Sequence, residues 1–180
     1  AAGPDDFVAA SAIGILSQTA DGALARGMAA KLATLPPVRK ALMLDALALR
    51  GDASVLPSVR PLLRDTDGGV REAAARALGV LGTAEDVECL AASAAGGSKA
   101  AAEAVAAIRD AKTDAAIVSL AGRSDPGTCV VLIEAAVARR SAGAAAMLAG
   151  QLGAAESAVQ VAAARGLAAI GAPSEVRALL

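Results

Sequence analysis

The chain has 180 residues, a formal net charge of −1 and a hydrophobic fraction of 56%, about half of it alanine, while histidine, tryptophan and tyrosine are absent. This charge balance lacks the basic excess with which proteins bind nucleic acids and anionic membranes. The absence of histidine excludes histidine-based catalytic triads and histidine-ligated metal sites. Every window of 18 residues contains a charge or a glycine, so the sequence predicts no transmembrane helix.

Segments with a helical period recur along the chain at intervals of about 30 residues. The two clearest copies are "VREAAARALGVLG" (70–82) and "VQVAAARGLAAIG" (159–171). Alanine, the best helix former, fills most positions between their larger apolar residues. In chain order, the expected first helices lie at 7–18, 38–51, 70–82, 97–109, 129–141 and 159–171.

A second, shorter helical pattern follows several of these copies, with apolar residues at i and i+3. Glycines 51, 82 and 171 are expected to end the first helices in the left-handed conformation, and Asp52, Thr83 and Ser174 to cap the next helices. Pro57 and Pro61 predict a bent or irregular helix. These second helices are expected within 51–65, 82–93, 112–120 and 171–180.

Each unit is therefore a helix, a tight turn and a second helix. A pair this short cannot bury its apolar face alone, whereas stacked copies bury it continuously. The sequence predicts an all-α fold, a right-handed α-solenoid of about five to six hairpins, forming a single domain over residues 1–180. Its two ends suggest an excised piece or a processed form of a longer protein.

The segment 51–90 resembles HEAT repeats, in particular the short type found in bilin lyases. The residues that carry this resemblance are Asp65, Asp67, Val70, Arg71, Ala73, Ala74, Leu78, Gly79, Leu81 and Gly82. In that family a loop aspartate pairs with the arginine and ties adjacent repeats together. The resemblance therefore implies that Asp65 or Asp67 pairs with Arg71, although other copies carry Ser98, Val130 or Gln160 in place of the arginine.

Three groups of residues have both a structural and a functional interpretation. Cys89 and Cys129 are expected to be small buried side chains rather than a redox pair, since stacked helices hold their backbones too far apart for a disulfide. The acidic group Glu85, Asp86 and Glu88 is expected to complement a helix N-terminus rather than to form a catalytic pair. A mildly basic N-terminal third is expected to be solvated, with docking of an acidic segment as the alternative. Its residues are Arg39, Lys40, Arg50, Arg60 and Arg64.

The favoured function is a non-catalytic protein-interaction or scaffold module that uses the concave face of the solenoid, lined by the second helices. We expect no cofactor and no metal, a protein or peptide partner, no nucleic acid and no membrane insertion, with a cytoplasmic location slightly favoured over a secreted or periplasmic one. The alternative is a lyase- or glycosylase-like enzyme that binds a chromophore or DNA, but the chain offers one aromatic residue for stacking. The expected binding residues are Ser54, Ser58, Glu85, Glu88, Lys112 and Asp114.

Overall fold

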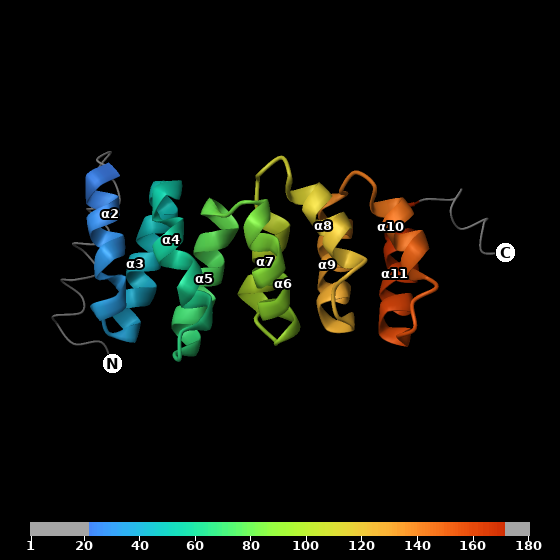
Figure 1. Cartoon of the computed structure of the whole chain (residues 1–180), viewed down its shortest axis with the longest axis horizontal. Coiled ribbons are helices and arrows are strands. Elements are labelled where there is room, and N and C mark those ends of the chain that lie inside the picture. The colour runs from blue at the N-terminus through green and yellow to red at the C-terminus, as the bar shows by residue number, and fades with distance from the viewer. Residues whose placement is uncertain (1–21, 172–180) are drawn as a thin grey trace. The chain divides into compact units, whose positions relative to one another are not determined.

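Consecutive helices lie side by side within each part of the chain (Figure 1). The structure, a computed structural model, describes residues 22–171, and every regular element in this range is a helix. The predicted all-α architecture of helical hairpins is confirmed here. The expected helix at 7–18 and the elements expected from Ser174 onward lie outside the described residues.

The first helices of the hairpins are α3 (Pro37–Arg50), α5 (Gly68–Leu81), α7 (Lys99–Ala107), α9 (Pro126–Arg139) and α11 (Ser157–Ile170). The second helices are α2 (Gly22–Lys31), the composite η2 (Ala53–Val55), α4 (Leu56–Val59) and η3 (Arg60–Arg64), then α6 (Val87–Ala95), α8 (Thr113–Ala121) and α10 (Ala144–Gln151). Short 3-10 turns η1 (Leu32–Thr34) and η4 (Ala84–Asp86) complete the described elements.

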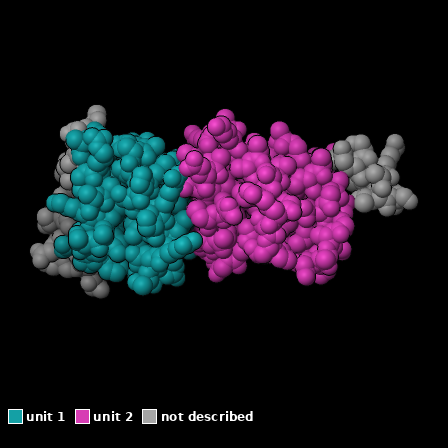
Figure 2. Space-filling model, viewed as in Figure 1, with its two compact units in different colours: residues 1–82 teal, residues 83–180 magenta. Residues whose placement is uncertain are grey.

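The chain divides into two compact units, residues 1–82 and residues 83–180 (Figure 2). In the first unit α3 packs along α5, and α2 contacts both α3 and the composite second helix. Leu44 and Leu47 of α3, Val59 of α4 and Leu78 of α5 are fully buried. This core is therefore made of aliphatic side chains of moderate size.

In the second unit α9 is the central helix, since it contacts α6, α7, α8, α10 and α11. Its Leu132 and Ile133 are almost completely buried, as are Ile117 of α8 and Leu148 of α10. Gly166 of α11 lies so close to the neighbouring helices that an added Cβ would stand 2.9 Å from Val137 Cγ2 and 3.0 Å from Leu148 Cδ2. Small residues thus permit the close helix packing that the sequence predicts.

Two of the three glycines expected to end first helices do so in the predicted conformation. Gly51 and Gly171 adopt the expected left-handed conformation, with φ of +73° and +64°. The expectation for Gly82 is wrong, because its φ is −67° and the chain leaves α5 in an extended conformation. That conformation leads directly into the turn in which the Asp86 carboxylate accepts a hydrogen bond from the Thr83 N–H at 2.9 Å.

The two prolines have the predicted effect on the second helix of their hairpin. Pro57 and Pro61 each stand in the first turn of a new helical segment, so that the stretch 53–64 alternates between 3-10 and α geometry. Asp52 caps its start by accepting a hydrogen bond from the Ser54 N–H at 2.9 Å. The irregularity arises because a proline lacks the N–H that a continuous helix requires.

Candidate functional site

The six residues expected to bind a partner do not form one cluster. Ser54 and Ser58 belong to the first unit, whereas Glu85, Glu88 and Lys112 belong to the second. Ser54, Glu85, Glu88 and Lys112 are exposed, and Ser58 is partly exposed. Each unit therefore presents its own second-helix surface.

Asp114, the sixth expected binding residue, is occupied within the fold. Its Oδ1 accepts hydrogen bonds from Arg139 Nε at 2.7 Å and from the Ser141 hydroxyl at 2.8 Å. The hydrogen bond from Arg139 is the main cause that holds the pKa of Asp114 below its ordinary value, and the hydrogen bond from Ser141 adds to it. This carboxylate joins two hairpins, and its side chain stays 37% exposed.

Arg139 also binds the C-terminus of α7. Its Nη1 donates to the carbonyl oxygens of Ala106 at 2.9 Å and Ile108 at 2.6 Å, which are carbonyls at the C-terminus of α7. A helix leaves its last carbonyls without intrahelical partners, and here a guanidinium from α9 satisfies two of them. Arg139 therefore links the ends of α7, α8 and α9.

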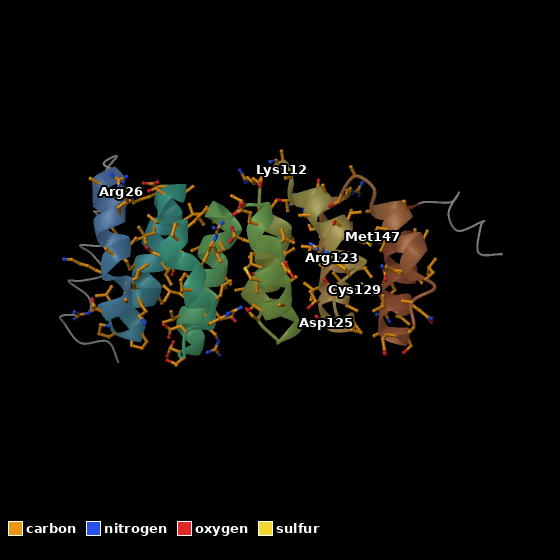
Figure 3. All side chains as sticks on the ribbon, viewed as in Figure 1. Arg26, Lys112, Arg123, Asp125, Cys129 and Met147 are labelled. Carbon is orange, nitrogen blue, oxygen red and sulfur yellow. The ribbon has the colours of Figure 1, made fainter. Side chains whose placement is uncertain are left out.

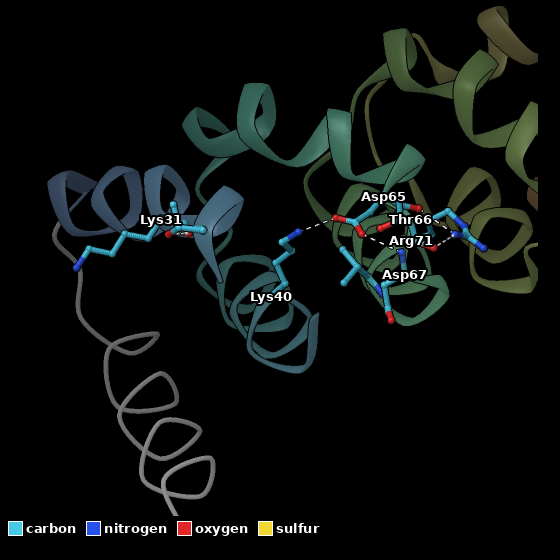
Figure 4. A network of polar contacts seen from close by, with 8 residues as sticks. Lys31, Lys40, Asp65, Thr66, Asp67 and Arg71 are labelled. Atoms are coloured by element: carbon cyan, nitrogen blue, oxygen red, sulfur yellow. Dashed lines mark hydrogen bonds and ion pairs between the residues drawn. The ribbon is translucent and has the colours of Figure 1, made fainter. Parts of the chain in front are cut away.

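The predicted inter-repeat group, Asp65, Asp67 and Arg71, has a different arrangement from the one that the resemblance implies (Figure 4). Arg71 Nη1 donates to the backbone carbonyls of Asp65 and Thr66, at 2.9 and 3.0 Å. The Asp67 carboxylate caps α5 by accepting from the Val70 N–H at 3.0 Å. The Asp65 carboxylate instead pairs with Lys40 Nζ on the previous first helix, at 2.8 Å.

Lys40 thus provides the link between repeats that the arginine was expected to provide. Its hydrogen bond is the main cause of the lowered pKa of Asp65, and the N–H of Asp67 contributes a second hydrogen bond. The sequence carried little signal for this pair, because Lys40 and Asp65 are 25 residues apart.

Two further aspartates use their carboxylates to hold turns. Asp110 accepts hydrogen bonds from the N–H groups of Ala84 at 2.8 Å and Lys112 at 3.1 Å, and these bonds lower its pKa. Asp125 caps α9 through Thr128, whose side chain and N–H both bind its carboxylate and lower its pKa. These carboxylates stabilise helix starts, as the sequence predicts for the acidic group near Thr83.

The two cysteines lie within the described range, and they form no disulfide. Cys129 is buried in α9, where desolvation raises the pKa of its thiol. Cys89 is partly exposed in α6, and its thiol donates to the carbonyl oxygen of Asp86 at 3.1 Å. Within residues 22–171, no three side chains of the histidine, cysteine, aspartate or glutamate types are grouped as metal ligands would be.

Surface hollows lie in the second unit, and two of them are relevant to binding. The first, of about 320 Å³, is lined by Glu88 and Ala92 of α6 and by the residues that connect α8 with α9. Figure 3 labels Arg123, which lies beyond the C-terminal end of α8 and lines this hollow, and Lys112, which lies at the opposite end of the same helix. Glu88 and Arg123 are exposed, and neither side chain has an ion-pair partner among the described residues. The second hollow, of about 590 Å³, lies between α9 and α11.

Exposed large apolar side chains, which the sequence analysis did not single out, all lie on first helices of the described range. They are Val38, Leu49, Val80 and Val161. Val161 occupies the place that Glu72 holds in the copy at 70–82, and Val130 the place of Arg71. The sequence signal for this exposed apolar surface was therefore an apolar residue at a repeat position that carries a charged residue in another copy.

Comparison with known proteins agrees with this architecture. Residues 26–109 match the family model of HEAT repeats, so this part of the chain consists of HEAT repeats. HEAT repeats generally mediate protein interaction or scaffolding. The predicted family is confirmed, whereas the bilin-lyase type of repeat stays a prediction. A search of curated proteins gave no match.

Among residues 22–171, no helix combines the length and the apolar character that crossing a membrane would require.

Proposed function

We propose that the chain is a non-catalytic protein-binding module and that its partner docks on the second helices. The observation that carries this proposal is that the charged groups of the second unit are of two kinds, those that bind other parts of the fold and those that are exposed. Asp110, Asp114 and Asp125 are engaged in caps and inter-helix links. Glu88 and Arg123 instead stand exposed beside a hollow of about 320 Å³.

This arrangement favours recognition over chemistry. A catalytic acid or base needs a reactive group in a site that excludes water and shifts its pKa toward the working pH. The aspartate pKa values that shift in this unit all move downward, because the carboxylates accept hydrogen bonds. Exposed charges of both signs on stacked helices suit a partner that carries complementary charges.

Site-specific crosslinking tests the proposal. A photo-reactive amino acid is placed at Glu88 or at Lys112 on the second helices of the full chain, and at Glu103 on α7 as the matched control. All three positions are exposed in the same unit. We expect crosslinked protein partners from Glu88 and Lys112 and none of these partners from Glu103. Equal crosslinking from all three positions would contradict a second-helix surface.

The alternative, an enzyme that binds a chromophore or DNA, is tested with the same purified chain. Saturable binding of a bilin in an absorbance titration, or of duplex DNA in a mobility-shift assay, at a stoichiometry near one would favour the enzyme. We expect neither, because the sequence contains one aromatic residue and no basic excess.

A further inference from the structure

From the groove between α9 and α11 we infer a second interaction surface, which fits an amphipathic helix that carries a basic residue on one flank of its apolar stripe and an acidic residue on the other. This surface lies on first helices, so it does not rest on the proposed second-helix surface. The apolar lining, the length and the charged rim of the groove all fit such a helix.

The groove is apolar because alanines and valines form its walls. Val130 and Val137 line it from α9, and Val161 and Ala162 line it from α11. Val161 is 47% exposed, and together with these neighbours it forms an apolar surface that is open to a partner. The volume of about 590 Å³ lies in the range of binding sites rather than of packing defects.

The dimensions of the groove favour a helix. Its lining extends from Ser157 to Ala169 of α11, about 18 Å at the helical rise of 1.5 Å per residue. That length corresponds to about three turns of a bound helix, whose residues at i, i+4, i+7 and i+11 would all face the groove.

The rim carries one unpaired charge on each wall, Glu134 on α9 and Arg165 on α11. Both are exposed, and neither has an ion-pair partner among the described residues. A comparison within the chain shows what such a pair can do. Asp45 and Arg76 are the ninth residues of α3 and α5, as Glu134 and Arg165 are of α9 and α11.

The two helix pairs differ in how these charges are used. Arg76 binds both carboxylate oxygens of Asp45, with Nη2 at 3.0 and 3.2 Å, and so connects α3 directly to α5. Across the groove the acid and the base stay apart. A bound helix with a cation facing Glu134 and an anion facing Arg165 would provide an ion-pair partner for each of them. This charge pattern distinguishes a helical segment from a purely apolar ligand.

The test uses the full chain and two synthetic 14-residue helices with leucines at i, i+4, i+7 and i+11. The mixed peptide has lysines on one flank and glutamates on the other, and the acidic peptide has glutamates on both. Fluorescence anisotropy of labelled peptide gives the affinities. We expect the chain to bind the mixed peptide more tightly, by about fivefold, as a rim charge pair allows.

Two variants make the test specific. Glu134→Arg leaves two cationic walls, and we expect the order of affinities to reverse in favour of the acidic peptide. Val161→Asp should weaken both peptides by at least about tenfold because it places a charge in the apolar lining. Val80→Asp changes another exposed valine on a first helix, α5, and should leave both affinities unchanged.

Four outcomes would overturn the inference. They are absence of peptide binding, equal affinity of the unaltered chain for both peptides, an unchanged order in Glu134→Arg, and equal effects of Val161→Asp and Val80→Asp. Self-association of the chain that Val161→Asp abolishes would instead assign the groove to a second copy. Circular dichroism of each variant establishes that its helix content is retained.

Discussion

Two buried threonines in first turns of helices differ in the use of their hydroxyls. Thr113 is fully buried in α8, and its Oγ1 has no hydrogen-bond partner among the described residues. Thr128 is 4% exposed in α9, and its side chain binds the Asp125 carboxylate. Because an unsatisfied buried hydroxyl is destabilising, Thr113→Val should leave the free energy of unfolding unchanged or raise it.

The matched substitution Thr128→Val should lower the free energy of unfolding by about 1 kcal/mol, the usual net value of one hydrogen bond. Urea unfolding followed by circular dichroism measures the free energy of unfolding of both valine variants. Equal losses in the two valine variants would show that the Thr113 hydroxyl has a partner.

Among the arginines of the second unit, Arg139 should contribute most to the free energy of unfolding. Arg139→Met would remove the hydrogen bonds to Asp114, Ala106 and Ile108, so that the two carbonyls lose this donor and the Asp114 carboxylate keeps only its bond from Ser141. We expect a loss of about 2 kcal/mol in the free energy of unfolding, since bonds to a charged group exceed neutral ones. The exposed Arg109 gives the control, because Arg109→Met should change stability by less than about 0.5 kcal/mol. Similar losses in both variants would refute the role of Arg139.

At the scale of the element, the N-caps of the second unit are unequal. Ser98 caps α7, and its hydroxyl oxygen accepts from the Ala101 N–H at 3.1 Å. Glu156 stands at the N-cap of α11 in an extended conformation, and its side chain makes no capping hydrogen bond. Ser98→Ala should therefore lower the free energy of unfolding by about 1 kcal/mol, and Glu156→Ser should raise it by about half as much. Thermal melts of both variants measure this, and an unchanged midpoint for Ser98→Ala would contradict it.

At the scale of the whole molecule, the pH dependence of stability below about pH 8 should be confined to acid. The pKa values of Asp52, Asp65, Asp110, Asp114 and Asp125 are all lowered from the ordinary 3.8. A lowered folded-state pKa stabilises the fold above the unfolded value, and this stabilisation is lost as the pH falls through the folded value. No histidine is present to titrate near neutrality.

We therefore expect the melting temperature to stay level between about pH 5 and 8 and to fall below about pH 4. Melts from pH 2 to 8 test this, and Asp114→Asn should reduce the acid slope. A decline between pH 5 and 8 would contradict the assignment of these shifts.

The sequence predicted the repeat well and the contacts between repeats poorly. First helices such as α5 and α11 begin two residues before their predicted starts and end one residue before their predicted ends, because the alanine–leucine pattern and the flanking caps are local signals. The second helices α2 and α10 were expected only from the repeat pattern, without a residue range for either. In "AAAMLAGQ" of α10 small apolar residues surround the helix, and no polar stripe marks its period. The pairs Lys40–Asp65 and Arg139–Asp114 each join residues 25 apart, which only the packing brings together.

The close fit around Gly166 limits how this protein can change by single mutations. Gly166→Ala would improve helix propensity, yet its new methyl group would overlap Val137 and Leu148. Val137→Ala alone would leave a void. In the double variant, the methyl group added by Gly166→Ala would occupy the space that Val137→Ala vacates. We expect a double-mutant cycle to show positive coupling, with the pair more stable than the sum of the single losses predicts. Because each single substitution would be destabilising and the pair less so, Gly166 would be hard to replace by one mutation at a time. This holds although alanine is the most common residue of the chain.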